Sequence, residues 1–203
     1  MRSLGTHDGL PDAARAGLVS LRRTQALMPT LSTPRMTLRP LRASDAAAYF
    51  DMRQNEELDR FSNYPPIHSL EEAERVLGLL LGRVQEGTLH IWAMVRHGEK
   101  NLVGVVALPR FDAANRATSL SYELRRDAWG QGLMREAARA VIDHAFRDLG
   151  VVRIQGEVDI ENTRSWRLGE SLGFQREGIL RKNVVVRGVS KDTVIYSLIA
   201  PEA

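Results

Sequence analysis

Apolar residues recur along this chain with two periods, and the change from one to the other predicts most of its secondary structure. Alternating or β-branched apolar runs indicate strands at residues 35–41, 90–96, 102–108, 117–124, 151–158, 175–186 and 191–199. Spacings of three and four residues predict helices from Ser44 or Asp45 to about Arg53, from Ser69 onward, and over residues 133–149 and 163–172. The resulting order is β-α-α-β-β-β-α-β-α-β-β.

All of these elements fall after residue 34, and the preceding segment has a different character. Residues 1–34 carry scattered glycines and prolines, with only a weak helical pattern around residues 13–28. We therefore expect an N-terminal extension or arm over residues 1–34 and one domain over residues 35–203. The extension is a mobile arm, a helix docked on a neighbour, or an over-long start before Met28. We favour an arm with little bearing on the chemistry. No apolar segment follows Arg2, which argues against a secretory signal.

Length, charge and cysteine content narrow the class of protein. A chain of 203 residues can bury a substantial core, and none of its apolar runs is long enough to cross a membrane. Its 28 Lys and Arg residues nearly balance 25 Asp and Glu residues, so we expect a solvated surface with a local anion site, and no nucleic-acid or membrane partner. The absence of cysteine excludes disulfides, thiolate metal sites and a cysteine nucleophile. We expect a cytoplasmic protein with no metal.

The stretch of residues 122–135 is the strongest chemical signal in the chain. An apolar strand pattern leads into Gly130-Gln131-Gly132, and a long helical pattern follows. Glycines allow a close backbone approach, and the free N–H groups of a helix N-terminus attract anions, so this turn predicts a phosphate or pyrophosphate site. No Lys-Ser or Lys-Thr follows as a P-loop requires, and Arg135 stands where a dinucleotide-binding fingerprint needs its third glycine.

What this stretch resembles is the pyrophosphate-binding loop of the GNAT superfamily, the acetyl-CoA-dependent N-acetyltransferases. Gly130 and Gly132 match the glycines of that loop, whereas its leading basic position is Asp127 here. The Trp-Gly-Gln-Gly form is similar to the branch of Rim-type ribosomal-protein N-terminal acetyltransferases. In that reading Arg125 and Arg126 supply the missing charge.

A second motif, Asn162-Thr163-Arg164-Ser165 followed by Gly173-Phe174, is similar to another signature of the family. Two motifs in register are much more specific than one, and the resemblance runs from about Arg35 to Ile199. It implies a GNAT-type α+β fold with a mixed, mostly antiparallel sheet of about seven strands and about four helices on both faces. It also implies acetyl-CoA as the acetyl donor, bound by Leu124, Arg125, Arg126, Trp129, Gly130, Gln131, Gly132, Leu133, Met134, Asn162, Ser165 and Arg167. Asn162 is alternatively a plain helix cap.

Catalytic roles are harder to assign. Many GNAT enzymes have a proton-donating Tyr four residues before the Gly-Phe pair, and that position is Gly169 here. The Rim-like branch suggests Ser165 as the acid instead, against the alternative of an ordinary polar residue. Glu123 is the carboxylate nearest the glycine loop and is our candidate base. It could equally be a solvated strand residue. Tyr122 alternates to the opposite face of the strand and is expected to line the substrate cleft.

The acceptor is expected to be a primary amine, best guessed as a protein N-terminus. Phe61 and Tyr64 stand in a proline-stiffened loop that closes over the acceptor in GNAT-like folds, although simple loop packing explains them equally well. Two alternatives stay open: acetylation of a small amine such as an antibiotic or polyamine, and a CoA-binding protein of the same fold without turnover. The protein is expected to be a monomer or a homodimer.

Overall fold

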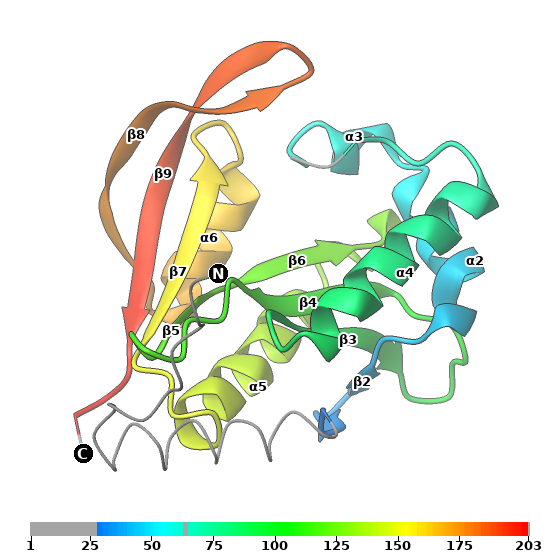
Figure 1. The fold of residues 1–203 in the computed structure, drawn as a ribbon, viewed down its shortest axis with the longest axis horizontal. Coiled ribbons are helices and arrows are strands. Elements are labelled where there is room, and N and C mark those ends of the chain that lie inside the picture. Colours follow the sequence, from blue (N-terminus) through cyan, green and yellow to red (C-terminus); the bar gives the residue numbers. More distant parts are fainter. Residues whose placement is uncertain (1–27, 63–64, 203) are drawn as a thin grey trace, which may run out of the picture.

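The computed structural model describes residues 28–62 and 65–202, so the predictions for residues 1–27 and for Tyr64 lie outside the described part. Nine strands form two sheets (Figure 1). In order across the first sheet these are β1 (Leu31–Ser32), β2 (Met36–Pro40), β3 (Leu89–Arg96), β4 (Gly104–Pro109) and β6 (Ser121–Leu124). The second sheet consists of β5 (Ala117–Ser119), β7 (Arg153–Asp159), β9 (Val189–Ile199) and β8 (Gln175–Val186). Only the β5–β7 pair is parallel.

The predicted α+β class is confirmed, and the structure shows why the sheet is divided. The predicted strand over residues 117–124 breaks at Leu120, whose N–H donates to the Gln155 carbonyl at 2.9 Å. The chain before Leu120 therefore pairs with β7, and the chain after it pairs with β4. Because β6 is the last strand of the first sheet, one of its edges faces the gap between the two sheets.

The helices match the predicted ones closely. They are α2 (Ala46–Arg53), the short α3 (Glu56–Asp59), α4 (Leu70–Gln85), α5 (Leu133–Arg147) and α6 (Thr163–Leu172), with single 3-10 turns at Ala43–Asp45 and Arg126–Ala128. Ser69 caps α4 as predicted, since its side chain accepts from the Glu72 N–H at 3.2 Å. Asp45 is the N-cap residue of α2, but its side chain makes no capping bond there, because its carboxylate binds Arg39 and the Arg42 N–H. In the described part no helix is long and apolar enough to span a bilayer.

Two apolar cores fill the two faces of the first sheet. Trp92 and Met94 of β3 are fully buried in the core beneath α5, whereas Ile91 and Ala93 are buried in the core beneath α2 and α4. This follows from strand geometry, since successive side chains point to opposite faces. Accordingly α4 and α5 lie on opposite sides of the sheet (Figure 1).

The segment just before residue 35 contributes to this sheet. β1 pairs with β2, and the Trp92 indole N–H donates to the Pro29 carbonyl at 2.8 Å. The side chains of Met28 and Leu31 also pack against the α5 core. The part of the predicted arm from Met28 onward is thus joined to the domain.

Candidate active site

A cavity of about 960 Å³ runs along the free edge of β6. The Arg125 N–H donates to the carbonyl of Val103, the residue just before β4, while the Leu124 carbonyl, turned the other way, accepts from the Trp129 indole at 2.7 Å. Since successive backbone groups alternate along an antiparallel strand, the N–H groups of Tyr122 and Leu124 point into the gap. The cavity therefore has a backbone edge with directed N–H groups in its wall.

The predicted glycine loop forms one end of the cavity. Gly130 and Gly132 adopt left-handed conformations, with φ of 73° and 74°, and Gly132 is the N-cap residue of α5. Such φ values favour glycine over residues with a Cβ. No side chain caps this helix end, and Gly132, Leu133 and Met134 all line the cavity. The open helix N-terminus in the cavity wall fits a phosphate group.

The charged and amide side chains predicted around this loop have other partners. Arg125 binds both oxygens of Asp127, at 2.7 and 2.9 Å, which neutralises the position that departs from the family pattern. This pairing lowers the pKa of the Asp127 carboxyl. The Gln131 side chain donates to the Asp127 carbonyl and accepts from Arg96. Neither Arg125 nor Gln131 is among the residues that line the cavity.

Two further arginines stack on the indole ring of Trp129 beside the loop. The guanidinium carbons of Arg126 and Arg164 each lie 4.7 Å from the centre of its indole ring, and both arginines pair with the Glu57 carboxylate of α3. Of the two, Arg164 lines the cavity and Arg126 does not. The predicted donor ligand Arg167 instead lies over the Trp166 ring and is also absent from the cavity wall.

The second motif borders the same cavity from α6. The Asn162 side chain accepts from the Ser165 N–H at 3.2 Å, so it caps the helix and also lines the cavity. The Tyr122 hydroxyl donates to the Ser165 carbonyl at 3.5 Å, and burial raises the pKa of Tyr122. Tyr122 and Ser165 thus converge on the α6 side of the β6 edge, and both line the cavity.

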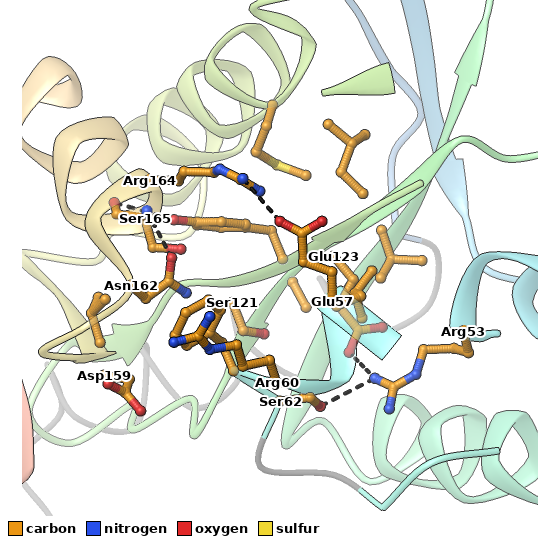
Figure 2. A pocket seen from close by; sticks show the side chains of 18 of the residues that line it. Arg53, Glu57, Arg60, Ser62, Ser121, Glu123, Asp159, Asn162, Arg164 and Ser165 are labelled. Atoms are coloured by element: carbon orange, nitrogen blue, oxygen red, sulfur yellow. Dashed lines mark hydrogen bonds and ion pairs between the residues drawn. The ribbon is translucent and has the colours of Figure 1, made fainter. Parts of the chain in front are cut away.

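Glu123 follows Tyr122 in β6, so its side chain points to the opposite face of the strand, and it also lines the cavity. Figure 2 shows it between Arg164 and Arg53. Its carboxylate pairs with the guanidinium of Arg53, a side chain that is 1% exposed, and accepts from the Tyr49 hydroxyl at 3.4 Å. Arg53 also donates to the Ser62 hydroxyl at 3.2 Å and to the Pro65 carbonyl at 3.3 Å. One buried arginine therefore holds both the candidate base and the loop expected to close over the acceptor.

The predicted acceptor loop does border the cavity. Phe61 lines it, with the Arg60 guanidinium 5.1 Å from its ring centre. Arg60 also lies 3.7 Å from the Glu161 carboxylate at the β7–α6 turn, which joins the loop to the second sheet. Figure 2 shows Arg53 and Ser62 at one side of the site and Asn162 and Ser165 at the other.

Sequence reasoning missed Arg53, Tyr49 and Glu57. Arg53 ends a helix and reads as a surface residue, and its partner Glu123 lies 70 positions away. The sequence holds one local signal, which is that apolar residues dominate the helix ending at Arg53. In the structure Ala46, Tyr49, Met52 and Arg53 of this helix are all buried. Among the described residues no group of three or more His, Asp or Glu side chains is arranged to hold a metal ion.

The glycine loop, the open helix end and the split sheet occur together in a known family. A family model described as an acetyltransferase (GNAT) domain matches residues 35–175. The chain belongs to the GNAT acetyltransferases. It is therefore an acetyl-CoA-dependent N-acetyltransferase.

Individual relatives agree on the enzyme class and differ in acceptor. The chain is 30% identical over 175 residues to an uncharacterized N-acetyltransferase, YoaA, of Bacillus subtilis, covering 86% of this chain and 99% of that one. It is 28% identical to the [ribosomal protein uS5]-alanine N-acetyltransferase of Escherichia coli, over 62% of this chain and 66% of that one. It is also 24% identical to the spermidine N(1)-acetyltransferase of Vibrio cholerae, over 77% of this chain and 88% of that one.

Solved structures confirm the fold of this GNAT domain. RimJ of Mycobacterium smegmatis, solved in complex with a CoA-disulfide, superposes with a TM-score of 0.78 over 86% of this chain and 90% of that one, at 24% identity. At that identity the likeness establishes the architecture, and the identity of the acceptor has to be argued from the site itself.

Proposed function

We propose that this GNAT enzyme transfers the acetyl group of acetyl-CoA directly to the N-terminal amine of a protein. The observation that carries the proposal is the cavity along the free edge of β6, whose wall includes both Gly130 and Gly132 of the glycine loop and the carboxylate of Glu123. Donor and acceptor can enter from opposite ends and meet at the strand edge. No residue of the chain need carry the acetyl group.

The donor end supplies groups suited to acetyl-CoA. The N-terminus of α5 offers unpaired N–H groups to the pyrophosphate, and the positive φ of Gly132 lets the loop turn directly into the helix. Arg135 and Arg164 line the same end and add positive charge. Leu124, Trp129, Leu133 and Met134 give apolar and aromatic contact, and Asn162 offers its amide to the pantetheine arm.

The transfer needs four events: attack by the amine, stabilisation of the oxyanion, departure of the thiolate with a proton, and removal of the amine proton. The β6 edge has groups for the second event and α6 has one for the third. A neutral amine attacks the thioester carbonyl carbon, forming the C–N bond and an oxyanion. The directed N–H groups of Leu124 and Tyr122 can stabilise that oxyanion. The C–S bond then breaks, and the leaving thiolate takes a proton from the Ser165 hydroxyl on α6, which regains one in the same step from water in the cavity. The raised pKa of Tyr122 keeps its hydroxyl protonated, so it can hold the Ser165 backbone in place.

The fourth event is removal of a proton from the amine, for which Glu123 was the candidate. Its carboxylate faces the acceptor end but is bound to Arg53. A guanidinium partner favours the charged carboxylate, which suits Glu123 to attract and orient an ammonium group more than to take its proton. We assign Glu123 to acceptor binding, with proton release to solvent through the open mouth of the cavity.

A protein N-terminus is favoured over a polyamine by the charges in the cavity. A polyamine site needs carboxylates that are available to several ammonium groups. Glu123 is assigned to the reacting amine, and four of the other five carboxylates lining the cavity already form ion pairs with Arg or Lys: Glu57, Glu157, Asp159 and Glu161. The fifth, Glu72, accepts from the His68 N–H. This favours an acceptor with one reacting amine.

Release of CoA thiol during turnover tests the proposal. Peptides with free N-termini should be acetylated at least tenfold more efficiently than spermidine, with acetylated product verified by mass spectrometry. Acetyl-CoA at 100 times its Kd should stabilise the fold by about 2.7 kcal/mol. Binding without turnover on any amine would instead support a CoA-binding protein, and a preference for spermidine would support the small-amine alternative.

A further inference from the structure

The wall of the cavity beyond Glu123 is apolar. In the first sheet Glu123 stands opposite Val105, Ser121 opposite Ala107, and Ala107 opposite Ile91. Side chains of directly opposed residues in antiparallel strands lie on the same face. Val105, Ala107 and Ile91 therefore continue the face that carries Glu123, and all three line the cavity.

Helix α4 forms the other wall of this part of the cavity. Val76 and Leu80 are one helical turn apart, so they lie on the same face of α4, and both are half-buried and line the cavity. Leu79, which directly precedes Leu80, is 67% exposed and does not line the cavity. The apolar lining is thus specific to one face of α4.

Charges near this wall disfavour a second cation. The charged α4 residues in the cavity wall are Glu72, Arg75 and Arg83, and neither arginine forms an ion pair with any described residue. A lysine side chain or a polyamine would meet two unneutralised guanidinium groups there. An aliphatic group would meet Val76, Leu80, Ile91 and Val105.

We infer that the acceptor carries an aliphatic side chain next to its reacting amine, so that the substrate is a polypeptide with an apolar N-terminal residue. The amine lies toward Glu123 and the β6 edge, and the side chain packs between α4 and the face of β3 and β4. This inference rests on the proposed function and adds a specificity to it. Each buried methylene should raise kcat/KM about fourfold.

Two substrate series test the inference. The first is a set of peptides with one common tail and Gly, Ala, Val, Leu, Asp or Lys at the N-terminus, and the second is the n-alkylamines from propyl to hexyl. We expect kcat/KM for the Leu peptide to exceed that for the Gly peptide about 100-fold. The Lys peptide should fall below the Ala peptide, and the Asp peptide below the Leu peptide, because burying a carboxylate against an apolar wall costs more than its attraction to the two arginines returns. The alkylamines should gain about fourfold per methylene.

Variants of α4 locate the effect. Leu80→Asp should lower kcat/KM for the Leu peptide about 100-fold and remove the preference for Leu over Lys, while acetyl-CoA affinity measured by calorimetry stays unchanged. The matched control Leu79→Asp, on the exposed face of the same helix, should behave as the natural protein. If Leu80→Asp does not fold, Leu80→Ala should still lower kcat/KM for the Leu peptide about tenfold.

The outcomes separate this inference from the proposed function. Acetylation of Lys or Asp peptides in preference to Leu, or an unchanged preference in the Leu80 variants, would overturn the apolar subsite and leave N-terminal acetylation standing. A methylene slope with alkylamines but no peptide product would keep the apolar subsite and overturn the protein acceptor. Bound acetyl-CoA with no product from either series would overturn both.

Discussion

Arg53 and Glu123 form an ion pair in the wall of the cavity, although 70 positions separate them in the sequence. The Arg53 side chain is 1% exposed and that of Glu123 is 15% exposed. The same guanidinium binds Ser62 and Pro65, so a single side chain from α2 connects β6 to the acceptor loop. Its removal should affect both stability and acceptor binding.

We expect Arg53→Met to destabilise the protein by about 3–5 kcal/mol, because it leaves a mostly buried carboxylate without its partner. Urea unfolding measures this change. Adding Glu123→Gln to the Arg53→Met variant should recover part of the loss, since the uncompensated charge is then removed. In the same variants KM for the acceptor should rise while acetyl-CoA affinity stays the same. Losses that simply add in the double variant would show that the two residues do not act as a pair.

Local sequence signals and tertiary contacts differ in how far the sequence alone predicts them. Elements with clear periodicity, such as α5 and β3, and the Gly130–Gly132 loop were identifiable because their signals are local. The division of the strand over residues 117–124 could not be identified from the sequence, because it depends on the hydrogen bond from Leu120 to Gln155 of β7, a distant segment. Arg125 and Gln131 were expected in the donor site, but Asp127 and Arg96 engage them. Which side chains pair depends on the tertiary structure, and the pairing of Arg53 with Glu123 could not be predicted for the same reason.

Ser165→Ala should lower kcat by about 10²–10⁴-fold with little change in acetyl-CoA affinity, if Ser165 protonates the leaving thiolate. Ser171→Ala is the matched control, because Ser171 belongs to the same helix but is exposed and does not line the cavity. Steady-state kinetics with calorimetry of acetyl-CoA binding decide the matter. A fall in kcat of less than tenfold would show that Ser165 is an ordinary polar residue of the helix and not the acid.

Stability should fall as the pH drops below about 6.5, because of His90. Burial, and then the nearby charge of His144, lower the pKa of His90, so the folded state holds this imidazole in its neutral form. The stabilising contribution is complete above the unfolded pKa and is lost as the pH falls through the lowered folded value.

Unfolding midpoints between pH 8 and pH 5 check this sign. His90→Phe keeps an aromatic ring against Trp92 and Phe111 and should flatten the pH dependence. His97→Gln changes an exposed histidine in the turn after β3 and should leave the dependence as it was. An equally steep profile in the His90 variant would assign the effect to another group.

Removal of residues 1–27 should change the stability of the domain by less than about 1 kcal/mol, which corresponds to about 2–4 °C in Tm for a chain of this size. The scattered glycines and prolines of that segment motivate the expectation. The truncated chain must keep Met28 and Pro29, which contact the α5 core and the Trp92 indole. Aggregation of the truncated protein, or loss of acetyl-CoA binding, would show that the segment is part of the folded unit.

The most direct test of the account is acetyl-CoA binding by Gly132→Val beside Gly188→Val. Both glycines have positive φ, 74° and 79°, and a Cβ at either position meets no protein atom closer than 3.6 Å. Backbone strain should therefore cost each variant a similar amount, about 2 kcal/mol. Gly188 lies in the β8–β9 turn and does not line the cavity. Calorimetry should show acetyl-CoA binding lost in Gly132→Val and retained in Gly188→Val. Normal binding by a folded Gly132→Val would place the phosphate site elsewhere and contradict the account.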